Sequence, residues 1–99
     1  MLKEFHALYG DNGFPNPSEI SIRRREHTGG GRYVELATAR STSCPDGYLD
    51  LGGKFISIEG VPNGMMAVVL IARGRPSILE ITVYGGDAWD GRETEWALK

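Results

Sequence analysis

The sequence contains very little cysteine and histidine, and this scarcity excludes several classes of protein. Cys44 is the single cysteine among 99 residues, so the chain has neither an internal disulfide nor a multi-cysteine metal site. A secreted fold built on disulfides is therefore excluded. His6 and His27 are the only histidines, and they show neither HxxH nor HExxH spacing. The sequence accordingly predicts no metal site and no cofactor.

The sequence also lacks a long apolar run and an excess of positive charge. Its longest apolar run, Met65–Ala72, is too short to span a bilayer. The first residues, Met1–His6, do not have the basic start and apolar core of a signal peptide. The net charge is −2, whereas nucleic-acid-binding domains normally carry a basic patch. These absences favour a cytoplasmic protein whose partner is neither a membrane nor a nucleic acid.

Glycine, by contrast, is abundant, with 14 residues that mostly cluster with Pro, Asn or Asp. Such clusters form turns, because Gly and Asn adopt positive φ readily and Pro presets the turn angle. The runs between the clusters are short and alternate apolar with polar residues, which is typical of half-buried antiparallel strands. The predicted strands of this kind are 20–23, 33–38, 48–51, 55–59 and 78–84.

Met65–Ala72 differs from these strands because it is apolar without alternation. An apolar run of this length predicts a central strand that is covered on both faces. Residues 73–76 or 73–77 then form a turn that contains Gly and Pro and leads into strand 78–84. The sequence therefore predicts an antiparallel hairpin over Met65–Tyr84.

One helix is predicted, at the N-terminus. Met1, Phe5 and Leu8 fall at helical spacing, and Gly10 follows as a natural stop. Residues 93–98 alternate and favour a last edge strand. The predicted fold is a single β-rich domain over residues 1–99, of the mainly β (α+β) class. It is a curved or closed antiparallel sheet of five to seven strands with one short N-terminal helix.

Residues 85–96 form the most informative stretch, with both tryptophans, four carboxylates and one arginine. Tryptophan beside carboxylates on a glycine-rich loop favours a docking surface for a basic protein. The alternative is that both tryptophans pack on the core while the carboxylates face water. The predicted binding residues are Asp87, Trp89, Asp90, Arg92, Glu93, Glu95 and Trp96.

Three other features of the sequence each have a functional and a structural interpretation. The run Arg23–Arg25 either docks an acidic partner or phosphate, or forms a solvated strand edge that resists aggregation. Gly29–Gly31 lacks the following Lys-Ser or Lys-Thr of a phosphate loop, so a flexible hairpin loop is favoured. Cys44 has no activating base or helix terminus close in sequence, which favours an unreactive thiol at a strand end.

The segment Met66–Ile81 has an apolar strand, a glycine-containing turn and then Leu79-Glu80-Ile81, followed by Tyr84-Gly85. This hairpin resembles one in small bacterial proteins, some of which are grouped with contact-dependent-inhibition immunity proteins. The resemblance covers one hairpin and implies a non-enzymatic protein that binds and neutralises a toxin. It assigns no role to any residue.

Three functions remain open at this point, and the first is favoured. It is a non-catalytic binding protein, of the immunity type, whose acidic C-terminal surface binds a basic toxin domain. The second is a small enzyme whose site is assembled from scattered residues. The third is a structural subunit of an oligomer. The apolar strand Met65–Ala72 needs a second cover and favours a homodimer. The candidates for the enzyme's site are His6, His27, Asp50, Glu80 and Asp87.

Overall fold

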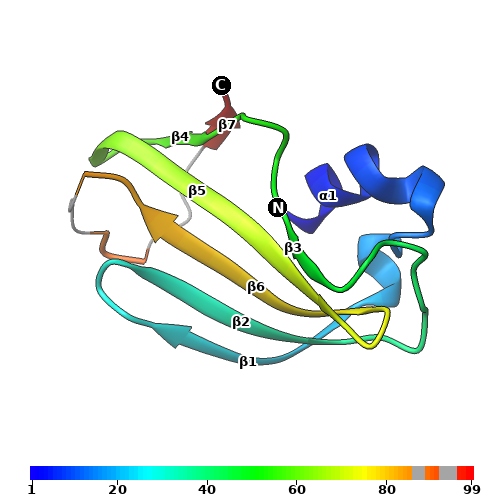
Figure 1. Ribbon diagram of the computed structural model, residues 1–99. Coiled ribbons are helices and arrows are strands. Elements are labelled where there is room, and N and C mark those ends of the chain that lie inside the picture. Colours follow the sequence, from blue (N-terminus) through cyan, green and yellow to red (C-terminus); the bar gives the residue numbers. More distant parts are fainter. Residues whose placement is uncertain (86–88, 92–95) are drawn as a thin grey trace.

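The computed structural model describes residues 1–85, 89–91 and 96–99 of the chain. Within these residues, one short helix precedes an antiparallel sheet of seven strands (Figure 1). The mainly β class and the N-terminal helix are confirmed. The elements are α1 (Leu2–Tyr9), the 3-10 helices η1 (Gly10–Asn12) and η2 (Pro17–Glu19), and the strands β1 (Ser21–His27), β2 (Gly31–Ala37), β3 (Gly47–Leu49), β4 (Ile56–Ile58), β5 (Val61–Ala72), β6 (Arg75–Val83) and β7 (Trp96–Leu98).

The helix α1 depends on packing for its stability, because eight residues alone are marginal in water. Its Phe5 side chain is fully buried and stacks on Phe14 with ring centroids 6.1 Å apart. Gly10 does not end the helix in the left-handed conformation that the sequence predicted. It keeps right-handed helical angles and leads into η1, and the left-handed residue is Gly13, at φ 83°. None of the described helices has the length and apolar character needed to cross a membrane.

The strand order of the sheet is β1-β2-β6-β5-β4-β7, and β3 also pairs with β5. Among the described strands, β1 and β7 form the two ends, so the sheet is open. The predicted hairpin is confirmed, since β5 and β6 pair from Met65 with Val83 to Ala72 with Arg75. The glycine loop before Gly31 joins β1 to β2, as the sequence predicted. The long β5–β6 hairpin is therefore the centre of the fold (Figure 1).

Within the described residues of one chain, the central strand β5 is covered on one face, so the chain does not itself supply the predicted cover on both faces. Its buried side chains are those of Met65, Ala67, Val69 and Ile71, each at most 3% exposed. The residues between them, including Val68 and Leu70, are half-exposed. The physical reason is that an antiparallel sheet is stable with one face packed and one facing solvent. Within the described residues, α1 lies on the packed face, where Met1 and Leu2 line a hollow with Val34, Leu79 and Ile81.

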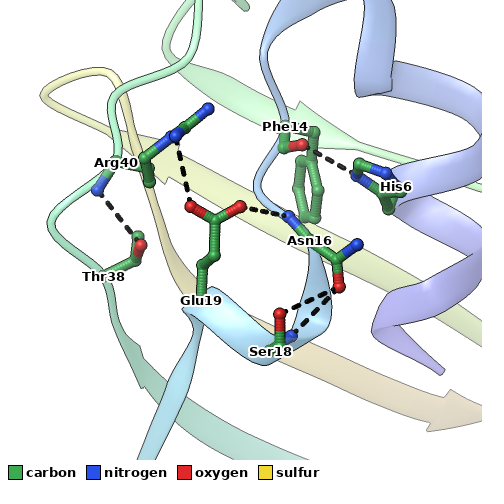
Figure 2. Close-up of polar contacts among 7 residues, drawn as sticks. All are labelled: His6, Phe14, Asn16, Ser18, Glu19, Thr38 and Arg40. Atoms are coloured by element: carbon green, nitrogen blue, oxygen red, sulfur yellow. Dashed lines mark hydrogen bonds and ion pairs between the residues drawn. The ribbon is translucent and has the colours of Figure 1, made fainter.

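The segment between α1 and β1 contains a capping box, and an ion pair joins it to the loop that follows β2. Asn16 Oδ1 accepts a hydrogen bond from the Ser18 backbone N–H, and Glu19 Oε1 accepts one from the Asn16 backbone N–H (Figure 2). These two bonds form a capping box on η2. The other oxygen of Glu19 lies 3.3 Å from the Arg40 guanidinium. The charge of Arg40 is therefore paired within the fold.

Candidate functional site

The structure describes three of the seven predicted binding residues, Trp89, Asp90 and Trp96. Trp89 is 4% exposed and belongs to the core, and Asp90 beside it is exposed. Trp96 is half-buried, pairs with Ile58 across the sheet and packs against the core. For Trp89, the alternative interpretation holds, in which the ring packs on the core. The other predicted residues, Asp87, Arg92, Glu93 and Glu95, lie outside the described residues.

Trp89 is held in place by the β1–β2 hairpin. Its ring lies under the Arg32 guanidinium at 4.8 Å and meets the His27 ring edge-on at 5.6 Å. Its backbone N–H donates to the Gly29 carbonyl oxygen at 3.1 Å, and Arg32 Nη2 donates to the Gly91 carbonyl oxygen at 2.6 Å. Cation–π and charge-assisted contacts of this kind are strong when partly buried. These contacts therefore hold residues 89–91 against the β1–β2 hairpin.

A small acidic pocket lies beside Trp89. It has a volume of about 280 Å³ and is lined by Glu59, Gly60, Val61, Trp89 and Asp90. Both carboxylate residues are exposed. Two of the predicted binding residues, Trp89 and Asp90, therefore line one hollow together with Glu59. Asp90 was predicted as a binding residue from the sequence. Glu59 was not, because it lies far from residues 85–96 along the chain.

The residues considered for an enzyme do not come together in the described structure. His6 Nδ1 donates to the Phe14 carbonyl oxygen at 2.9 Å (Figure 2), and His27 packs on Trp89. Asp50 Oδ1 accepts from the Gly52 backbone N–H at 2.8 Å, and Glu80 lies on the exposed face of β6. Asp87 lies outside the described residues. Within the described part of the chain, no group of three His, Cys, Asp or Glu residues could hold a metal ion.

The largest candidate surface is the side of the sheet away from α1, here named the open face. Cross-strand registers place its members on one side, for example Val68 opposite Glu80 and Tyr48 opposite Leu70. Tyr48 is 65% exposed and Tyr33 is 42% exposed. The open face consists of Arg24 and Glu26 on β1, Tyr33 and Glu35 on β2, Tyr48 on β3, Met66, Val68 and Leu70 on β5, and Ile78, Glu80 and Thr82 on β6.

The apolar part of the open face is contiguous. Met66, Val68 and Leu70 follow one another along β5, and Tyr48 stands directly across from Leu70. A hollow of about 170 Å³ adjoins Met66 and Val68 and is also lined by Tyr84. A row of half-exposed apolar side chains beside a hollow can receive an anchoring side chain of a partner. Alternation along β2 and β6 indicated which residues share this face, but not that the described parts of the chain leave it half-exposed.

The residues that make up the open face include more acidic than basic side chains. Glu26, Glu35 and Glu80 lie on it with a single arginine, Arg24, whose guanidinium is 3.9 Å from Glu26. The pKa of Tyr33 is raised above its ordinary value, first because the Glu80 carboxylate disfavours the phenolate. Desolvation and the hydrogen bond to Glu80 raise this pKa further. The face thus combines apolar and tyrosine area with carboxylates.

Comparison with protein-family models, with curated proteins and with solved structures finds no match to this chain. The likeness of the Met66–Ile81 hairpin to immunity proteins therefore stays a prediction.

Proposed function

We propose that the protein is a non-catalytic binding protein that docks a basic protein partner on the open face of its sheet. The observation that carries this proposal is the half-exposed apolar row Met66, Val68 and Leu70 with the exposed ring of Tyr48 beside it. Tyrosine and methionine are enriched in protein interfaces, and tyrosine supplies contact area with little loss of conformational freedom.

Charge selects the partner. The carboxylates of Glu26, Glu35 and Glu80 outnumber the one guanidinium on the face, so a surface with Lys or Arg is attracted and an acidic one is repelled. The acidic pocket beside Trp89 has the same sign and offers a second place for a cationic side chain. An immunity-type inhibitor that covers a basic toxin domain is the form of this function that the hairpin resemblance implies.

A second copy of the chain is the alternative occupant of the open face. Two copies would bury apolar area, but they would also bring two sets of carboxylates together. Like charges facing each other across an interface are unfavourable. We therefore place a different, basic protein on this face and treat the homodimer as an outcome of the test.

The test uses matched substitutions on the two faces of the molecule. Proteins retained by the purified chain from a lysate of its source are identified by mass spectrometry, and each is then purified and titrated by calorimetry. Tyr48→Ala and Glu35→Lys are expected to weaken binding at least about tenfold, because both side chains are exposed on the open face. Both residues are exposed, so the variants should fold normally, which circular dichroism checks.

The controls are Leu8→Ala and Asp11→Lys, which make the same kinds of change at exposed positions on the other side of the chain. They are expected to leave the affinity within about twofold. The proposal is overturned if the identified partner binds the open-face variants as tightly as the parent chain. It is also overturned if light scattering at micromolar concentration shows a stable dimer that Tyr48→Ala dissociates, because the face would then be occupied by a second copy.

Cys44 is expected to be dispensable for this binding. Its side chain is 7% exposed and packs in the core, away from the open face. Cys44→Ser should keep the fold and the affinity for the partner, but it should lower the free energy of unfolding by about 1–3 kcal/mol because a hydroxyl is buried in place of a thiol. Urea denaturation and calorimetry measure the two quantities. A lost affinity with an unchanged circular dichroism spectrum would contradict the prediction.

A further inference from the structure

A separate cavity of about 520 Å³ is lined by residues from the start of β1, the end of β2 and the β5–β6 turn. Figure 1 shows these segments at one end of the sheet. The residues that line the cavity include three arginines, Arg23, Arg73 and Arg75, together with Thr38 and Ser77. We propose that this cavity, the arginine pocket, binds a small phosphorylated molecule with at least two phosphate groups. The proposal is independent of the partner on the open face.

The three arginine side chains of the arginine pocket form no ion pair within the described part of the fold, although the Asp46 carboxylate lies at the backbone of Arg73. None of its lining residues is acidic, and within residues 1–85, 89–91 and 96–99 no carboxylate forms an ion pair with Arg23, Arg73 or Arg75. The nearby Arg40 differs, because it is paired with Glu19 (Figure 2). Arg23, Arg73 and Arg75 line one hollow and are exposed, so an anion bound between them would lower their mutual repulsion.

Arg73 has an unfavourable backbone conformation. It is the one non-glycine residue with positive φ in the described chain, at 54°, and Gly74 follows at 75°. Two positive φ values in a two-residue hairpin turn favour Asn-Gly, so arginine at the first position is a poor choice for the turn alone. The turn is held by Asp46, whose carboxylate accepts the backbone N–H groups of Arg73 and Gly74 at 3.2 and 3.0 Å. The presence of arginine at this position therefore indicates a role other than forming the turn.

Two β-bulges bring further residues to the same cavity. The register of β1 and β2 steps from Ile22–Leu36 to Arg24–Glu35, which leaves Arg23 without a cross-strand partner. The register of β5 and β6 steps in the same way past Ser77. A bulge re-aims a side chain and disturbs the strand, so bulges are common beside functional sites. Three irregular backbone positions thus supply residues to one pocket.

The chemistry of the lining selects phosphate. A guanidinium donates two parallel hydrogen bonds to a phosphate, and three of them match the charge of a diphosphate. The hydroxyl of Thr38 accepts the Arg40 backbone N–H at 3.1 Å, which leaves its own hydrogen to donate to a phosphate oxygen. Leu36 and Pro76 are buried and form an apolar floor for the organic part of the ligand. The cavity volume is within the usual range for small-molecule sites.

The test titrates the full chain with inorganic pyrophosphate by calorimetry, with inorganic phosphate and sulfate compared at the same ionic strength. Pyrophosphate is expected to bind one to one with a dissociation constant below about 1 mM and at least about tenfold more tightly than either single anion. Arg73→Asn is expected to weaken pyrophosphate binding at least about tenfold while its melting temperature without ligand stays the same or rises, because Asn suits the turn. That pair of results separates a ligand role from a structural one.

Arg23→Ala is a second test, and Arg24→Ala is its matched control, because the two remove neighbouring charges of the same strand. Arg23 lines the pocket, whereas Arg24 lies on the open face. Arg23→Ala should weaken binding at least about tenfold, and Arg24→Ala should change it less than about threefold. The inference is overturned if pyrophosphate binds no more tightly than sulfate, or if the two substitutions have equal effects. Equal effects would mean that pyrophosphate is attracted to the positive charge of the strand as a whole and is not bound in the pocket.

Discussion

Replacing Gly31 with alanine is expected to destabilise the protein by about 3 kcal/mol or more, a large part of the total stability of a domain this size. Gly31 pairs with Thr82 between β2 and β6 and is buried. A Cβ atom at this position would overlap the carbonyl oxygen of Ile81 and lie 3.2 Å from the Thr82 Cα atom. These are backbone atoms of a central strand, so β6 must move and lose its ladder bonds to β2.

Gly30→Ala is the matched control for this change. Gly30 is exposed, and a Cβ atom added there meets no other atom within 4 Å. We expect Gly30→Ala to change the free energy of unfolding by less than about 0.5 kcal/mol. Urea denaturation followed by circular dichroism measures both variants. Equal midpoints for the two variants would show that β2 and β6 are not packed as closely as described.

Replacing Phe5 with alanine is expected to cost about 3–5 kcal/mol of stability. Phe5 is 0% exposed and supplies the main buried side chain of α1, stacked on Phe14. Because an eight-residue helix is marginal alone, loss of this anchor should also undock α1 from the sheet. Urea denaturation gives the change in stability. Amide hydrogen exchange of α1 should accelerate by more than that of β5.

Leu8→Ala on the same helix is the control for Phe5→Ala. Leu8 is 48% exposed, so its truncation removes little buried area, and a change below about 1 kcal/mol is expected. A Phe5→Ala variant as stable as Leu8→Ala would contradict the assignment of Phe5 as the anchor. Faster exchange in β5 than in α1 would contradict the docking of α1 as a separate layer.

The hairpin of β5 and β6 was predictable because its information is local. Apolar residues fill Met65–Ala72, the turn residues follow directly, and the alternation in 78–84 sets the register. The helix was predictable for the same reason, from the spacing of Phe5 and Leu8. Its end was not, because Gly10 keeps helical angles while η1 completes the turn toward Phe14.

The position of Trp89 was not predictable in this way. Tryptophan beside carboxylates fits an exposed anchor as well as a core residue, and the sequence left both open. The ring is buried because Arg32 lies over it and because its backbone bonds to Gly29, both on a hairpin distant in the chain. Glu59 joins the acidic pocket by the same long-range packing.

The amino-acid order therefore specifies the strands, the turns, the short helix, the absence of disulfides and the sets of residues that share a strand face. Those properties depend on neighbours within a few residues, through backbone preferences and the two-residue repeat of a strand. The packing of distant segments specifies that α1 lies on the packed face of the sheet and that Val68 and Leu70 stay half-exposed. It also brings Arg23 to Arg73 and Arg75, because bulges and turns change the direction of a side chain where alternation alone would predict another.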